Sequence, residues 1–96
     1  MRVVFTRRYL QELESISDAI AQHDPVAAAR IVNEIHTKAS RLLSAHPFIG
    51  RPGEISGTRE LVIVGTAYVL AYRVVNEQVE VLFVQHGARA WPDAIE

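Results

Sequence analysis

The spacing of apolar residues changes once along this chain, from helical to strand-like, and this change limits the fold more than any other feature. From residue 6 to residue 45 the apolar positions recur every three or four residues. After Gly57 they alternate or run together in short segments bounded by turn residues. Of the 96 residues, 49% are hydrophobic and 22% are charged, as in one small folded domain spanning 1–96. The sequence therefore predicts an α+β domain whose helices and strands are segregated along the chain.

Two consecutive helices are predicted in the first half of the chain, after a short strand at residues 2–5. Thr6 can cap the first helix, because its hydroxyl can accept a free backbone N–H. The apolar stripe of this helix consists of Leu10, Leu13, Ile16 and Ile20. Its acidic residues, expected to face solvent, are Glu12, Glu14 and Asp18. Asp24 then caps the second helix, and Pro25 fits its first position. So short a connection predicts an antiparallel helical hairpin.

The second half of the chain is predicted to consist of strands and loops. Residues 46–57 contain Pro and Gly repeatedly and are expected to form a loop. Strands are expected at 61–64, 67–75 and 79–86, followed by an irregular tail over 87–96. The complete order is βααβββ, with the helical hairpin packed on one face of a mostly antiparallel sheet.

A loop of two or four residues centred on Asn76-Glu77 sets the register of the last two strands. It pairs Arg73 with Glu80, a favourable cross-strand pair, as well as Tyr72 with Val81, Leu70 with Phe83 and Ala67 with His86. One face, which includes Phe83, then fills the core against the helices. The other face is expected to be open and carries Val69, Ala71, Leu82 and Val84. An apolar patch on an open sheet face predicts a protein partner.

Charge and cysteine content exclude several classes of protein. The formal net charge of −1 excludes a strongly basic nucleic-acid binder that works mainly by neutralising phosphates. The absence of cysteine excludes disulfides and thiolate zinc sites, and the four histidines lack metal-ligand spacing, so neither a metal nor a cofactor is expected. No apolar run reaches the roughly 18–20 residues of a membrane span. We expect a cytoplasmic protein that does not associate with membranes.

A small set of residues remains as candidates for chemistry or binding: Arg51, Arg59, Arg73, His86, Arg89 and Trp91. Metal-independent RNA cleavage needs a group that takes the 2′-hydroxyl proton, an acid for the leaving oxygen and a cation for the phosphate. His86 could carry a proton and Arg89 could supply the cation. In the structural alternative, Arg89 bonds to carbonyls or a carboxylate and Trp91 covers an edge of the core. Ion pairs with Glu60 or Glu80 are the favoured interpretation of Arg59 and Arg73.

Taken together and in this order, several short segments resemble the RelE/ParE toxin superfamily. They are Gly50-Arg51-Pro52-Gly53, Gly57-Thr58-Arg59-Glu60-Leu61, the strand segment 68–73, and His86-Gly87-Ala88-Arg89-Ala90-Trp91-Pro92. The helical hairpin fits as well, so the resemblance covers nearly the whole chain. It implies the toxin of a type II toxin–antitoxin module, as in plasmid stabilisation systems. It also implies a small antitoxin partner with a ribbon-helix-helix or similar DNA-binding domain.

The branches of this superfamily differ in activity. The RelE branch cleaves messenger RNA on the ribosome with basic residues on the second strand, an Arg on the third, an Arg after the last strand, and often a Tyr or His near the C-terminus. Carried over by position, only the Arg after the last strand is present, as Arg89. The second-strand positions hold Glu60 and Val62, the third-strand position holds Val69, and the C-terminal position falls near Ile95. The sequence is therefore more similar to the ParE branch, which is associated with inhibition of DNA gyrase.

The leading hypothesis is thus a toxin that inhibits gyrase by protein contact, without a catalytic residue. The antitoxin is expected to bind Val69, Ala71, Leu82 and Val84, while Arg51, Arg59, Arg73, Arg89 and Trp91 are target-binding or structural residues. One alternative is a ribosome-dependent endoribonuclease that uses His86 and Arg89. The other is a toxin fold without toxicity.

Overall fold

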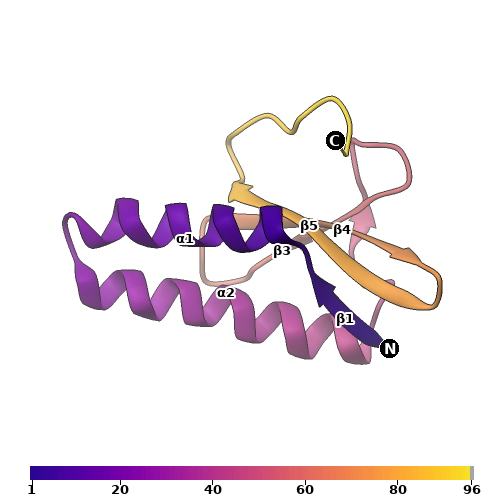
Figure 1. Ribbon diagram of the computed structural model, residues 1–96, viewed down its shortest axis with the longest axis horizontal. Coiled ribbons are helices and arrows are strands. Elements are labelled where there is room, and N and C mark those ends of the chain that lie inside the picture. The colour runs from indigo at the N-terminus through magenta and orange to yellow at the C-terminus, as the bar shows by residue number, and fades with distance from the viewer. Residues whose placement is uncertain (96) are drawn as a thin grey trace.

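The computed structural model describes residues 1–95 and places two helices against one face of a five-stranded sheet (Figure 1). The elements are β1 (Arg2–Phe5), α1 (Arg7–Ala21), α2 (Pro25–Ala45), β2 (Arg51–Pro52), β3 (Arg59–Val62), β4 (Tyr68–Val75) and β5 (Gln78–His86). The strands lie in the order β1-β5-β4-β3-β2, and β1 pairs parallel with β5 while the other neighbours are antiparallel. The predicted architecture is confirmed. The structure adds the short strand β2 inside the segment predicted as a loop.

Both predicted helix starts are confirmed by their capping bonds. The Thr6 hydroxyl accepts a hydrogen bond from the Tyr9 N–H at 3.2 Å, and the Asp24 carboxylate accepts one from the Ala27 N–H at 3.0 Å. Each bond satisfies a backbone donor that has no partner within its helix. In residues 1–95 no helix is both long and apolar enough to cross a membrane.

The main core lies between the helical hairpin and the sheet. Its fully buried members include Tyr9 from α1, Ile35 and Leu43 from α2, and Leu70 and Tyr72 from β4. The buried alanines Ala28 and Ala39 lie on α2. Small side chains at such positions let a helix approach its neighbours closely.

The register of β4 and β5 follows the prediction only near their turn. Asn76 and Glu77 both have positive φ, 52° and 58°, as a two-residue type I′ turn requires, and Arg73 lies opposite Glu80. Farther from the turn, a β-bulge shifts the pairing by one residue. The predicted pairs Leu70–Phe83 and Ala67–His86 are wrong, because Leu70 pairs with Val84 and Tyr68 with His86.

Leu82 is the extra residue of this bulge, since Tyr72 pairs with Val81 and Ala71 with Phe83. An extra residue reverses the faces of every side chain beyond it. Val84 therefore lies in the main core beneath the helices, although an open position was predicted for it. Phe83, predicted to fill that core, lies on the opposite face of the sheet.

That opposite face is covered, so the prediction of an open apolar patch is wrong. Ile55 forms a second buried cluster there with Ala71, Leu82 and Phe83, and Trp91 and Ile95 pack against it. The exposed fractions of Val69, Ala71, Leu82 and Val84 are only 7%, 1%, 5% and 2%. The irregular tail, described up to residue 95 with Glu96 outside the described residues, thus supplies part of the cover (Figure 1).

Candidate functional site

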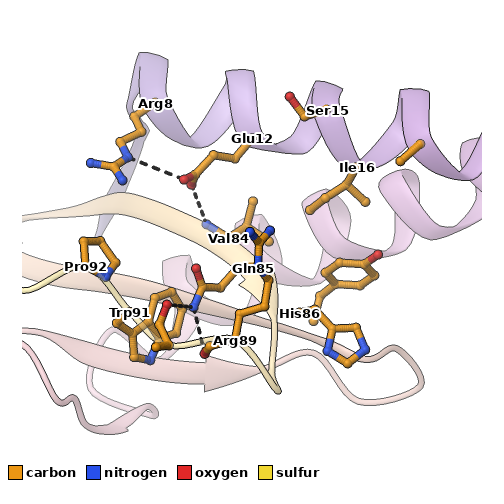
Figure 2. A pocket seen from close by; sticks show the side chains of 13 residues that line it. Arg8, Glu12, Ser15, Ile16, Val84, Gln85, His86, Arg89, Trp91 and Pro92 are labelled. Atoms are coloured by element: carbon orange, nitrogen blue, oxygen red, sulfur yellow. Dashed lines mark hydrogen bonds and ion pairs between the residues drawn. The ribbon is translucent and has the colours of Figure 1, made fainter.

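A cleft of about 570 Å³ lies between α1, the C-terminal half of β5 and the segment that follows β5 (Figure 2). Arg8, Glu12 and Ile16 line it from α1, residues 84–86 from β5, and residues 89–92 from the tail. Three sequence candidates, His86, Arg89 and Trp91, therefore meet at this cleft. The cleft also brings in α1, which the sequence did not single out.

Glu12 joins α1 to β5 across the cleft. Its Oε1 accepts a hydrogen bond from the Val84 N–H at 3.0 Å, and its Oε2 accepts one from Arg8 Nε at 3.4 Å (Figure 2). The side chain is 29% exposed, so the expectation that Glu12 simply faces solvent is wrong. The reason is tertiary: β1 ends at Phe5, and the edge of β5 beyond Val81 needs another acceptor for its N–H groups.

The histidine and arginine of the cleft differ in how firmly they are held. His86 Nδ1 accepts a hydrogen bond from the Ala88 N–H at 3.1 Å, which leaves Nε2 to carry the proton of the neutral ring. The ring meets Tyr68 edge-on, with 5.9 Å between centroids. The Arg89 guanidinium makes neither a hydrogen bond nor an ion pair within residues 1–95, although its backbone carbonyl accepts one from Gln85 Nε2 at 3.1 Å. Arg89 is thus an exposed cation at the rim of the cleft.

Trp91 has the structural position that the sequence suggested. Its ring centroid lies 6.4 Å from that of Phe83, and it packs on the second apolar cluster. Arg8 contacts the same Phe83, with its guanidinium carbon 4.4 Å from the ring centroid. Phe83 is therefore contacted from both α1 and the tail.

The other candidate arginines do not line the cleft, and each binds a group of the protein itself. Arg73 Nε donates to Glu80 Oε1 at 2.7 Å, which confirms the predicted pair. Arg59 does not pair with Glu60. It donates to the carbonyls of Phe48, at 3.3 Å, and Gly50, at 2.8 Å.

Arg51 is the partner of Glu60, and this pair was not predicted. Arg51 Nε and Nη2 donate to Glu60 Oε1 at 3.1 and 2.9 Å, and the Glu54 N–H donates to Oε2 at 2.9 Å. The carboxylate of Glu60 is buried, but all of these donors compensate it. The pair joins β2 to β3 and anchors the segment after β2.

Arg8 and Glu12 are the site residues that sequence reasoning missed as functional candidates. A basic and an acidic residue four positions apart on a helix lie on one face and can form an ion pair. That signal places the two side chains together. It carries no information about Val84, which is distant in the chain.

The chain matches the family described as "ParE toxin of type II toxin-antitoxin system, parDE" over residues 3–91. It is 42% identical over 94 residues to "Putative toxin Y4kP" of Sinorhizobium fredii, covering 98% of this chain and 96% of that protein. It is 38% identical over 88 residues to "Toxin RelE2" of Caulobacter vibrioides, covering 92% and 97%.

Two solved structures have a similar fold. One comes from the chromosomal ParDE toxin–antitoxin system of P. aeruginosa, with a TM-score of 0.82, 25% identity, and 90% of this chain and 95% of that chain covered. The other comes from the toxin–antitoxin complex RelBE2 of Mycobacterium tuberculosis, with a TM-score of 0.66, 26% identity and 92% of each chain covered. Since the family match spans most of the chain and the relatives are similar over nearly their whole length, the chain belongs to the ParE toxin family of type II toxin–antitoxin systems.

Proposed function

We propose that this toxin inhibits DNA gyrase in the cytoplasm by protein contact, and that a cognate antitoxin with a DNA-binding domain, of the ribbon-helix-helix type, neutralises it. The observation that carries the choice of target is the chemistry of three positions where the RNA-cleaving branch of the superfamily has cations. They are Glu60, Val62 and Val69 in this chain.

The surroundings of these three residues support the proposal. Glu60 is a buried carboxylate held by Arg51, so this position offers a phosphate no free positive charge. Val69 is buried and Val62 is an exposed apolar side chain. A positioned acid, base or cation typically contributes ~10² or more to the rate of such a reaction. A ribonuclease that lacks the cation at every one of these three positions would lose most of its rate.

The proposal keeps only part of the antitoxin contact that was predicted from the sequence. Val84 borders the cleft, whereas Leu82 and Ala71 belong to the cluster beneath Ile55 and the tail. An antitoxin could reach Leu82 or Ala71 only after those segments moved away. The Val84 side chain lies in the main core at 2% exposure, so an antitoxin could reach only the backbone of Val84, at the edge of β5 that lines the cleft.

A ribosome-dependent ribonuclease is the second candidate, because His86, Arg89 and Arg8 line one cleft. His86 could transfer a proton at Nε2, and the Arg89 guanidinium has no partner within residues 1–95. One of the relatives is named "Toxin RelE2". The two candidates predict different molecular targets, so they can be separated directly.

The deciding experiment tests the protein, made by cell-free synthesis, in two parallel assays. One measures gyrase supercoiling of a relaxed plasmid, and the other measures the integrity of messenger RNA on translating ribosomes. We expect blocked supercoiling and intact RNA. Codon-position-specific cuts that disappear in His86→Ala or Arg89→Ala would establish the ribonuclease instead. Arg41→Ala, an exposed α2 residue outside the cleft, is the matched control. Inactivity in both assays would indicate a toxin fold without toxicity.

A further inference from the structure

The outer edge of β5 is longer than the strand that covers it. β1 pairs with residues 78–81 and ends at Phe5, whereas β5 continues to His86. Within residues 1–95, no strand pairs with this edge beyond Val81. The uncovered part of the edge faces α1 across the cleft, as Figure 2 shows for Val84 and Glu12.

The backbone groups of this uncovered edge are satisfied in part by side chains. Where β1 ends, the Thr6 hydroxyl donates to the carbonyls of Val81, at 2.8 Å, and Leu82, at 3.4 Å, and farther along Glu12 accepts from the Val84 N–H. The N–H and C=O of one residue point to the same side of a strand, and residues two apart share that side. The Val84 carbonyl and the His86 N–H therefore also point away from β4, toward the cleft. An edge of this kind is a template for an added strand.

The charges around the edge indicate what kind of strand it would accept. Arg8, Arg89 and His86 supply basic groups, and Glu12 is the one acidic residue among those lining the cleft. Glu12 is already bound to Arg8 and Val84, while the Arg89 guanidinium is free within residues 1–95. Apolar surface comes from the partly exposed Ile16 and Trp91. An extended segment with alternating acidic and apolar side chains is complementary to this lining.

We propose that an acidic segment of the antitoxin binds this cleft in an extended conformation and pairs with β5 at Val84 and His86, in line with β1. The added strand takes the Val84 N–H from Glu12, and its carboxylates face Arg8 and Arg89. Main-chain pairing of this type supplies affinity, and the side-chain contacts supply specificity. The inference rests on the proposed antitoxin partner. It does not depend on which target the toxin inhibits.

A protein segment suits the cleft better than a nucleic acid does. A nucleic acid has no chain of alternating N–H and C=O groups to pair with Val84 and His86. Nucleic-acid binding is therefore an outcome that the test must be able to detect.

The test measures amide hydrogen exchange of the isotope-labelled chain, alone and in complex with its cognate antitoxin. We expect the His86 amide to exchange at least tenfold more slowly in the complex, and the Val84 amide to stay protected in Glu12→Ala once the antitoxin is bound. If Glu12→Ala does not fold, the His86 amide of the unsubstituted chain decides the test alone. A complex in which the His86 amide exchanges as in the free chain would overturn the proposal.

Affinity measurements test the charge argument. We expect the double variant Arg8→Glu/Arg89→Glu to weaken antitoxin binding at least tenfold, and more at low salt than at high salt. Arg30→Glu/Arg41→Glu, on exposed α2 positions outside the cleft, is the matched control and should bind normally. Equal loss in both double variants would contradict the proposal. So would binding of a single-stranded RNA oligonucleotide that requires Arg8 and Arg89 and competes with the antitoxin.

The two proposals fail in different ways. A complex with a protected His86 amide and no inhibition of gyrase would overturn the proposed target but leave the strand pairing intact. Gyrase inhibition together with an antitoxin that leaves His86 unprotected would do the reverse.

Discussion

The hydroxyl of Tyr72 accepts a hydrogen bond from the Gly50 N–H at 2.8 Å, which ties the segment after α2 to the middle of the sheet. Both residues are buried. A Cβ at Gly50 would lie 2.7 Å from the Tyr72 hydroxyl, closer than such atoms approach in proteins. Glycine is therefore required here because of the close approach of Tyr72.

Removal of the Tyr72 hydroxyl should leave the Gly50 N–H buried without an acceptor. We expect Tyr72→Phe to lower the free energy of unfolding by about 1–3 kcal/mol, the cost of an unsatisfied buried donor. Urea denaturation measures this loss. Tyr68→Phe is the control, since the Tyr68 hydroxyl has no hydrogen bond within the described part of the chain, and a similar loss in both variants would refute the assignment.

Stability should fall in alkali because of two tyrosines. Burial raises the pKa of Tyr9 and of Tyr72 above the ordinary value of 10.0, and for Tyr72 the Gly50 bond and the charge of Arg59 offset this in part. Above about pH 10 the unfolded chain loses these protons while the folded chain keeps them, so the free energy of unfolding decreases as pH rises. Denaturation from neutral pH upward should show this decline.

The same series with a phenylalanine in place of one tyrosine identifies the groups responsible. Tyr9→Phe removes a titrating group whose hydroxyl oxygen lies 3.0 Å from His36 Nδ1, and it should make the alkaline decline shallower. A slope that is the same with and without the Tyr9 hydroxyl would assign the decline to other groups.

The packing of α2 against the sheet can be tested at Ile35, which is fully buried in the main core. Ile35→Ala should cost about 2–5 kcal/mol, through lost apolar burial and the cavity left behind. Val26→Ala, on the same helix at 80% exposure, should change stability by less than about 0.5 kcal/mol. Thermal unfolding of the two variants measures the difference in stability. A small effect of Ile35→Ala would mean that a different face of α2 packs against the sheet.

A charge at Leu82 should disrupt the fold itself. Leu82 is buried with Ile55 and Phe83, so Leu82→Asp places an uncompensated carboxylate in an apolar cluster. We expect a loss of about 3–5 kcal/mol, the scale for an unpaired buried charge. Val62→Asp, at an apolar side chain that is 44% exposed, should remain folded. A stable Leu82→Asp variant would mean that the second cluster contributes little to the fold.

Most of the fold could be predicted from signals between residues close in the sequence. The features that could not be predicted depend on tertiary contacts. The caps at Thr6 and Asp24 and the turn at Asn76-Glu77 depend on residues close together in the chain, and all three are confirmed. The bulge at Leu82 has no such local signal, because residues 81–84 are all apolar and nothing in this run marks one of them as the extra residue. The predicted open face assumed that successive side chains of β5 alternate between the two faces without a bulge, and it was wrong in part for that reason.

The cleft shows the same division between local and distant information. His86 and Arg89 lie close in the chain, and sequence reasoning placed them together correctly. Their approach to Arg8 and Glu12 depends on where α1 packs over β5, and no spacing rule in one sequence encodes that distance. A prediction restricted to motifs therefore identified one wall of the cleft.

The parallel pairing of β1 with β5 has a consequence for how the protein is made. Residues 2–5 leave the ribosome long before residues 78–81, so β1 has no partner while the helices and β4 are being synthesised. Pairings this distant in the chain form slowly, because a long loop must close first. Nascent chains that end before β5 can contain a helical hairpin but no cleft. The newly synthesised chain therefore acquires this cleft late, at the step that joins its first strand to its last.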